Sequence, residues 1–287
     1  MENNRLTLTI VVDNEVGDGL LNEHGFAAWI ELGPQRLLFD TGQGHALLPN
    51  CEKLGIDLTQ ADALIISHGH YDHTGALTDF LARNPVAPLF SGPGFARERF
   101  SCHPGKAVRD ISIGNTVREA LHRLPEARCI TVTAPRYLFP GIGISGPIPR
   151  QNSFEDTGGP FFLDEDQQQA DLLDDELALW FETTEGLLIL TGCCHAGLLN
   201  TVAHIRRISG ITRLHGIIGG LHLLHASAQR LAQTQRFLAD CAPAFVVPCH
   251  CSGEQATLQL QANLGEDRVQ AGRAGQVFTM TLAPRIA

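Results

Sequence analysis

The chain has 287 residues, a hydrophobic fraction of 44% and a formal net charge of −10 at pH 7, which together fit a globular protein with one shared core. It has no block of lysine and arginine and no stretch near the roughly 20 apolar residues of a membrane span, so we expect neither a nucleic-acid surface nor a membrane segment. The N-terminus lacks the pattern of a signal peptide, and we expect a cytoplasmic protein with reduced cysteines.

The first half of the chain begins with alternating apolar residues, which predict antiparallel strands over residues 6–12, 26–32 and 35–40. A helix is predicted over 46–54, a buried strand over 63–67 and a further helix over 74–83. Residues 85–160 are rich in glycine and proline, with short strands around 129–133 and 138–144, so we expect mostly loops and edge strands there.

The run His68-Gly69-His70-Tyr71-Asp72-His73 lies between that buried strand and the next helix. Imidazole nitrogen and carboxylate oxygen are ligand types that suit zinc, manganese or iron. Three histidines and one carboxylate within six residues therefore predict a metal site at a strand end, with enough ligands for two neighbouring metals.

The second half alternates strands and helices. We expect a hairpin over 177–183 and 186–190, helices over 198–208, 226–240 and 254–264, strands over 214–218 and 244–247, and short strands near 269 and 276–280. Two of these strands again deliver a histidine at the tip, His195 and His250. Cysteines accompany both: Cys193 and Cys194 precede His195, and Cys249 and Cys251 flank His250.

Strands followed by strand–helix alternation in both halves predict an α/β fold, a four-layer αββα sandwich of two mixed sheets with outer helices. No long linker separates the halves, approximately 1–150 and 170–287. We therefore expect a single domain over residues 1–287, with the ligands gathered at one edge.

On these motifs the chain resembles the metallo-β-lactamase-fold superfamily. The matching positions are Asp40 after an early strand, His68, His70, Asp72 and His73 in the H-x-H-x-D-H run, the tip from Gly192 to His195, and His250. Further strings, such as Gly219-Gly220-Leu221-His222 and Pro248-Cys249-His250-Cys251, look like the branch that includes the dihydropterin–ribofuranosylaminobenzene phosphate synthases of methanopterin biosynthesis. Branch-level resemblance leaves open whether the reaction is hydrolysis or transfer.

The resemblance implies two divalent metal ions. Zinc is the expected metal, and manganese and iron are the alternatives. His68 and His70 are assigned to the first metal, and Asp72, His73 and His250 to the second. In much of the superfamily an Asp or Cys follows the glycine at the fourth strand tip, a position that aligns with Cys193. The separate middle histidine has no clear match, because His103 and His122 lack its glycine-rich setting, and we expect His195 to supply that ligand.

Four further roles are expected. Asp40 would fix a ligand histidine by a hydrogen bond or simply cap a turn, and Asp72 would bind metal or orient the nucleophile. His222 would bind substrate or relay a proton, and Arg150 would grip an anionic group. The remaining histidines without recognisable ligand spacing are expected to be structural: His24, His45, His204, His215 and His225.

A metal lowers the pKa of its bound water to roughly 7 and supplies hydroxide at neutral pH. The leading hypothesis is therefore a dinuclear metal hydrolase of a small anionic ester, phosphoester or lactone. The alternatives are a transferase that condenses a dihydropterin methyl diphosphate with a ribofuranosylaminobenzene phosphate, and a non-catalytic metal-binding metabolite sensor. The sequence leaves the oligomeric state open.

Overall fold

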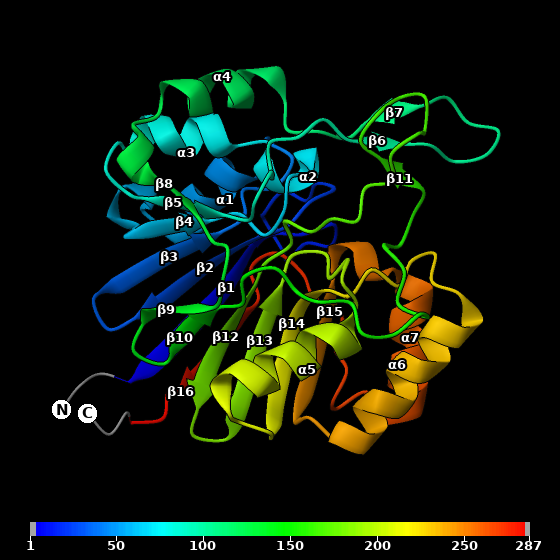
Figure 1. The fold of residues 1–287 in the computed structure, drawn as a ribbon. Helices are drawn as coiled ribbons and strands as arrows, with labels where there is room; N and C mark the ends of the chain where they lie inside the picture. The colour runs from blue at the N-terminus through cyan, green and yellow to red at the C-terminus, as the bar shows by residue number, and fades with distance from the viewer. Residues whose placement is uncertain (1–3, 285–287) are drawn as a thin grey trace.

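Two mixed β-sheets lie face to face in the computed structural model, which describes residues 4–284 (Figure 1). The seven-stranded sheet has the order β16 (Val277–Thr281), β1 (Arg5–Val12), β2 (Ala27–Leu32), β3 (Gln35–Phe39), β4 (Ala63–Ile65), β5 (Leu89–Ser91) and β8 (Cys129–Thr131). The six-stranded sheet has the order β15 (Phe245–Cys249), β14 (Leu214–Gly220), β13 (Gly186–Thr191), β12 (Ala178–Thr183), β10 (Ile142–Ile144) and β9 (Arg136–Phe139).

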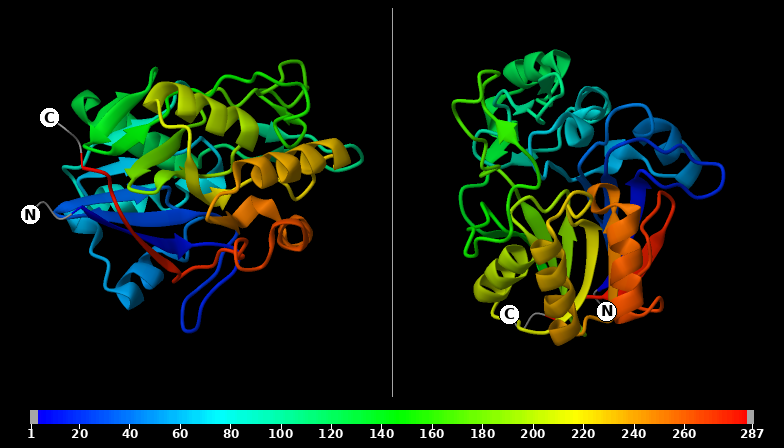
Figure 2. Two further views of the ribbon diagram at one scale, coloured as in Figure 1. Left: turned by 90° about the horizontal axis from the view of Figure 1, so that it is seen from below. Right: turned by 90° about the vertical axis from the view of Figure 1, so that its right-hand side faces the viewer.

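Helices cover the outer face of each sheet, which gives the predicted αββα layers. The seven-stranded sheet carries α1 (Leu47–Leu54), α3 (Leu77–Arg83) and α4 (Asn115–Arg123), and the six-stranded sheet carries α5 (Leu198–Ser209), α6 (Ala228–Cys241) and α7 (Glu254–Leu264). The right-hand view of Figure 2 shows the two sets of helices on opposite sides. Short 3₁₀ turns are η1 (Leu58–Gln60), η2 (Glu126–Arg128) and η3 (His250–Ser252).

Three apolar clusters separate these layers. Alternation along each strand decides which cluster a side chain joins: Leu179 and Phe181 of β12 pack between the sheets, whereas Ala178 and Trp180 pack under the helices. The central cluster contains residues from both sheets, all of them almost completely buried. Both sheets therefore share one core, and the strand tips keep a fixed position relative to each other.

The middle of the chain contains more helix than predicted. Residues 115–123 form α4, in which Val117 alone is buried, so its apolar periodicity is weak in the sequence. The helix expected over 74–83 is divided into α2 (Tyr71–Thr74) and α3, so Asp72 and His73 lie on a short helical turn. A small third sheet of β11 (Phe161–Phe162), β6 (Phe100–Ser101) and β7 (Arg109–Asp110) stands beside this turn (Figure 1).

Parallel pairing brings the ligand-bearing strand ends to one edge. Strand β3 is parallel to β4, and β13, β14 and β15 are mutually parallel neighbours. Carboxyl ends of parallel strands open at the same edge of a sheet, where ligands of open α/β sheets bind. The segments that follow these strands carry the histidines and cysteines singled out from the sequence. None of the helices within residues 4–284 is long and apolar enough to cross a bilayer.

Candidate metal centre

The first group of potential ligands consists of His68, His70 and His195, all buried. One potential donor atom from each lies within 4.8 Å of the others, and Nε2 of His68 is 3.0 Å from Nδ1 of His70. Burial is the main cause that holds the pKa of each imidazole well below its usual value. The next cause is a neighbouring histidine for His68 and His195, and Arg99 for His70. Neutral imidazoles offer lone pairs at neutral pH, which is the state that metal binding requires.

Four imidazoles are held by oxygen atoms at their outward-facing nitrogens. Nδ1 of His195 donates to the carbonyl of Thr157 at 2.7 Å, and Nδ1 of His250 donates to Oδ1 of Asn14 at 2.8 Å. In the same way, Nδ1 of His68 lies 2.9 Å from Oγ of Ser67, and Nδ1 of His73 lies 2.7 Å from Oδ2 of Asp40. In each ring Nε2 is left facing the cluster, as in metal-binding histidines, whose second nitrogen usually donates to a carboxylate or carbonyl.

Asp40 holds the ring of His73 and the backbone at Ser67, just after β4. Its carboxylate accepts from Ser67 N at 2.6 Å and Ser67 Oγ at 2.7 Å as well as from His73. Asp40 itself has φ 59°, a left-handed conformation that non-glycine residues rarely adopt. Burial lowers the pKa of His73, but the contact with Asp40 outweighs it and raises the pKa to about 9.

A second group of potential ligands consists of His24, Asp72 and His250. Oδ2 of Asp72 lies 3.1 Å from Nε2 of His24 and 3.3 Å from Nε2 of His250. Burial raises the pKa of Asp72, yet the contacts with these two histidines outweigh it, and the pKa stays well below its usual value. His24, expected to be structural, thus lies at the centre. The sequence did not point to His24 as a ligand, because it lies in the loop before β2, away from the other histidines of the site.

Cys193 lies where the groups meet. It shares one group with His68 and His73, another with His195 and His222, and a third with His250 and Cys251. Its sulfur is 3.2 Å from Nε2 of His73. A thiol within 4.8 Å of potential donors in several of these groups is suitably placed to bind a metal ion there.

Several buried polar atoms of this cluster lack a hydrogen-bond partner within the described residues. They are His70 Nε2, Asp72 Oδ1, His195 Nε2, His222 Nδ1 and His250 Nε2. Buried polar groups are nearly always hydrogen-bonded, and unpaired ones are costly. Their convergence with thiol, imidazole and carboxylate donors fits divalent metal ions, because bonds to metal would satisfy them.

Two buried carboxylates, missed in the sequence, shape the turn that carries His195. Glu176 accepts from the backbone N–H groups of His195 and Ala196, and Glu155 accepts from those of Leu199 and Asn200 at the start of α5. Both glutamates come from loops far from this turn in the sequence. No local spacing could have pointed to them.

A buried ion pair holds the turn between His68 and His70 in a similar way. Asp175 Oδ2 accepts from the backbone N–H of Gly69 at 2.9 Å, and Asp175 Oδ1 lies 2.7 Å from Arg99. Arg99 also approaches Asp171 at 3.3 Å, and its side chain is fully buried. This network fixes the backbone on which the first histidine pair stands.

A cavity of about 240 Å³ opens beside these potential ligands. Its walls include Tyr71, Arg109, Phe161 and His222. The Arg109 guanidinium donates to the hydroxyl of Tyr71 at 2.5 Å and lies 4.9 Å from the ring centre of Tyr71. Arg150, the expected anion-binding residue, instead donates to the carbonyls of Glu155 and Leu172 and does not line this cavity.

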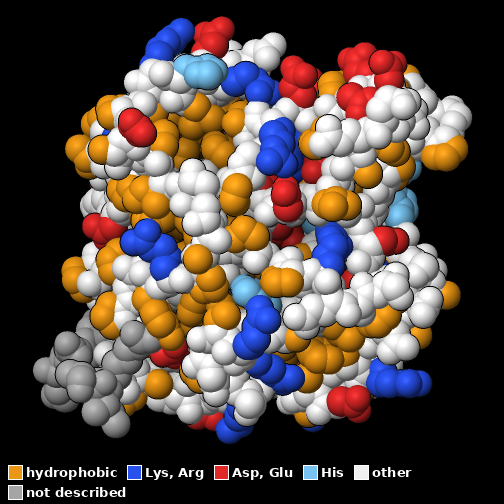
Figure 3. Space-filling model, in the orientation of Figure 1, with side chains coloured by type: hydrophobic (Ala, Val, Ile, Leu, Met, Phe, Trp, Pro, Cys, Tyr) orange, Lys and Arg blue, Asp and Glu red, His pale blue; other side chains and the backbone are white. Residues whose placement is uncertain are grey.

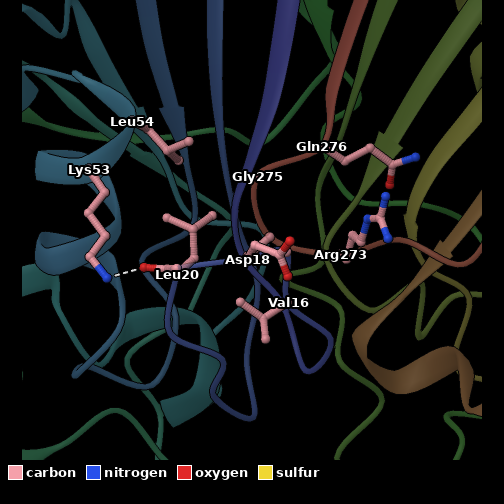
Figure 4. A pocket seen from close by; sticks show the side chains of 11 residues that line it. Val16, Asp18, Leu20, Lys53, Leu54, Arg273, Gly275 and Gln276 are labelled. Atoms are coloured by element: carbon pink, nitrogen blue, oxygen red, sulfur yellow. Dashed lines mark hydrogen bonds between the residues drawn. The ribbon is translucent and has the colours of Figure 1, made fainter.

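A larger cavity of about 670 Å³ lies elsewhere, between residues 16–20, the end of α1 and the segment before β16 (Figure 4). Its residues include Asp18, Lys53 and Arg273 but no histidine or cysteine, and Lys53 donates to the carbonyl of Gly19. Figure 3 shows acidic and basic side chains interspersed over the face that is turned to the viewer in Figure 1. The smaller cavity therefore has the stronger claim to be a reaction site.

The αββα layers and the histidine-rich strand edge define a class of proteins built around a metal centre. Residues 23–95 match the model of the metallo-beta-lactamase superfamily. The chain belongs to this superfamily, in the branch that contains an archaeal synthase to which it is 30% identical.

That relative is the 7,8-dihydropterin-6-methyl-4-(β-D-ribofuranosyl)-aminobenzene-5'-phosphate synthase of Methanocaldococcus jannaschii, and the alignment covers 88% of this chain and 89% of the synthase. An uncharacterised protein of the same organism is 29% identical, over 88% of this chain and 93% of its own length. A crystal structure described as a metal-dependent hydrolase of the β-lactamase superfamily superimposes with a TM-score of 0.80. It is 26% identical and covers 96% of this chain and 99% of its own.

Proposed function

We propose that the protein is a dinuclear metal-dependent hydrolase of a small anionic ester, phosphoester or lactone. The observation that carries this proposal is the set of four imidazoles with Nδ1 held by oxygen and Nε2 facing a common cluster. Bound zinc would supply a water of lowered pKa and a Lewis acid for the substrate oxygen.

The side chains around the cluster have separable roles in this proposal. Asp72 belongs to the group with His24 and His250, and its Oδ1 is free to accept a proton from the attacking water or to bind metal. Arg109 stands at the cavity wall and would hold an anionic group of the substrate. His222, whose ring centre is 4.3 Å from that of His195, would contact the substrate or hold a proton.

The test combines metal content with turnover. Zinc-reconstituted protein is expected to hold close to two metals per chain and to hydrolyse at least one member of a panel of phosphodiesters, esters and lactones. Asp72→Ala should abolish turnover while the protein stays folded, whereas Asp79→Ala, at a half-buried position on α3, should not. Absence of bound zinc, or unchanged turnover in Asp72→Ala, would refute the proposal.

The role of Arg109 has its own test. Inorganic phosphate should inhibit the wild type competitively, and Arg109→Ala should weaken this inhibition by about tenfold, as expected for the loss of a charge-assisted contact. Arg97→Ala is the matched control, because Arg97 is an exposed arginine paired with Asp174. Equal inhibition of both variants would remove Arg109 from the site.

The second candidate function is transfer, and the 30% identity to the archaeal synthase favours it. A carbon–nitrogen bond would form between the dihydropterin methyl carbon and the amino nitrogen of the phosphorylated acceptor, as the carbon–oxygen bond to diphosphate breaks and the nitrogen loses a proton. Incubation with both substrates separates the two functions. Diphosphate release that depends on the acceptor indicates transfer, and release without it indicates hydrolysis.

A further inference from the structure

Two cysteines and one histidine form a compact group at the inner end of the cavity. Potential donor atoms of Cys193, His250 and Cys251 lie within 4.8 Å of one another, and the three residues are no more than 7% exposed. Cys193 follows β13 and the other two follow β15, and these parallel strands flank β14 in the six-stranded sheet, so their ends open at the same edge.

The spacing of these donors suits a tetrahedral metal. Zinc–sulfur bonds are about 2.3 Å and zinc–nitrogen bonds about 2.0 Å, so two ligand atoms on one zinc ion stand roughly 3.3–3.8 Å apart. Donors within 4.8 Å of one another reach these separations by small side-chain rotations. His250 also belongs to the group that contains Asp72, which places a carboxylate beside the same position.

The backbone places Cys251 at this point. His250 adopts φ 48°, a left-handed conformation, and η3 then turns the chain so that Cys251 faces Cys193. A Cβ atom on Gly220 would lie 2.6 Å from the sulfur of Cys251, so a larger residue at position 220 would displace it. The thiol makes a long contact of 3.5 Å to the carbonyl of Cys193 and also interacts with the side chains of Cys193 and His222.

The other buried cysteines near the site differ in their surroundings. Cys249 belongs to the apolar cluster between the sheets and donates to the carbonyl of Val247, and Cys194 belongs to the cluster under the helices of the second sheet. Neither Cys193 nor Cys251 belongs to any of the three apolar clusters. Their thiols therefore face the metal-binding side chains, whereas those of the other two pack in the core.

We propose that Cys251 is a metal ligand and that, with Cys193 and His250, it makes the second metal position rich in sulfur. This inference rests on the metal centre proposed above and goes further in naming the metal. Thiolates favour zinc over manganese, whereas carboxylates and water suit manganese. The second position would then select zinc, and a mixture of zinc and manganese would not load manganese there.

Cobalt(II) is the probe, because it takes the place of zinc and gives a near-ultraviolet charge-transfer band only when a thiolate binds it. The wild type, Cys193→Ser and Cys251→Ser are each loaded with cobalt, and the bound metal is counted by elemental analysis. Cys249→Ser is the matched control, because it changes a buried thiol beside His250 that packs in the core. Thermal unfolding establishes that each variant is folded.

The wild type and Cys249→Ser should show the full band. Each of Cys193→Ser and Cys251→Ser should lose about half of it per bound cobalt, and the double variant should lose all of it. An undiminished band in Cys251→Ser would overturn the assignment of Cys251. Cobalt binding without any thiolate band would overturn the sulfur-rich site while leaving the hydrolase proposal intact, and absence of cobalt binding would overturn both.

Discussion

Replacing Asp40 with asparagine should weaken the metal centre without touching any metal ligand. The carboxylate accepts three hydrogen bonds at 2.6–2.7 Å, two from Ser67 and one from His73, and all of these groups are buried. An asparagine amide can accept at only one of its two ends, so its NH₂ group must face at least one of these donors. One hydrogen bond to a charged group contributes about 1.5–3 kcal/mol, and the free energy of unfolding should fall by about that amount.

The loss also depends on pH. In metal-free protein the pKa of His73 is about 9, raised above its ordinary value of 6.5 chiefly by Asp40 against the opposing effect of burial. Because the pKa of His73 is higher in the folded state, the interaction of protonated His73 with Asp40 stabilises the fold fully below pH 6.5. This stabilisation disappears as the pH rises through 9. The difference in unfolding free energy between wild type and Asp40→Asn should therefore be largest below pH 6.5 and shrink towards pH 9.

The assay for the metal is zinc affinity against a competing chelator at fixed free zinc. Loss of the group that orients a ligand histidine typically lowers affinity by 10–100-fold, and we expect a value in that range for Asp40→Asn. Asp57→Asn is the matched control, because Asp57 is an exposed carboxylate that accepts from the backbone N–H and the hydroxyl of Thr59. Zinc affinity within threefold of the wild type would refute the view that Asp40 orients His73.

Arg99→Met should lower the free energy of unfolding by about 3–5 kcal/mol, because it leaves two buried carboxylates without their cation; an unchanged denaturant midpoint would contradict this. Gly69→Ala should yield protein with reduced zinc content, since its Cβ would lie 1.6 Å from the carbonyl oxygen of Phe95, whereas Gly114→Ala, whose nearest contact is 3.9 Å, should load normally. Burial raises the pKa of Asp13 from 3.8 to about 8, so the folded state favours the protonated carboxyl group. The contribution of Asp13 to stability is therefore full below pH 3.8 and is lost as the pH rises through 8. Asp13→Asn keeps this side chain neutral at every pH. In thermal unfolding without metal, the variant should therefore lose less stability than the wild type between about pH 5 and 8. Parallel pH profiles of the two proteins would show that Asp13 does not titrate in this range.

The layered fold and the gathering of His68, His70, His195 and His250 at one edge were predictable from local patterns. Apolar strands, short turns and histidines directly after strand ends are all features of neighbouring residues, and the parallel pairing of those strands does the rest. The resemblance to a superfamily then supplied the order of the ligands along the chain.

The surroundings of the site were not predictable in this way. His24, Glu176 and the Arg99–Asp175 pair approach the histidines from loops that are distant in the sequence, and their side chains have no periodicity of their own. Arg150 was expected to bind an anionic group, and the sequence could not show that its guanidinium also donates to the backbone carbonyls of Glu155 and Leu172. A single sequence gives residue types and spacing, whereas such contacts depend on how distant loops pack.

The pairing of β16 with β1 has a consequence for how the protein comes to be folded. These antiparallel strands, registered from Arg5 opposite Thr281 to Thr9 opposite Val277, come from opposite ends of the described chain. During synthesis β1 would therefore present an open edge until nearly all of the chain had left the ribosome, and open edges invite pairing between molecules. Contacts this far apart in sequence also form slowly, because the loop between them must close first. Shortening the chain from its C-terminal side should accordingly produce aggregates rather than a smaller soluble protein, even though every metal-binding residue would still be present.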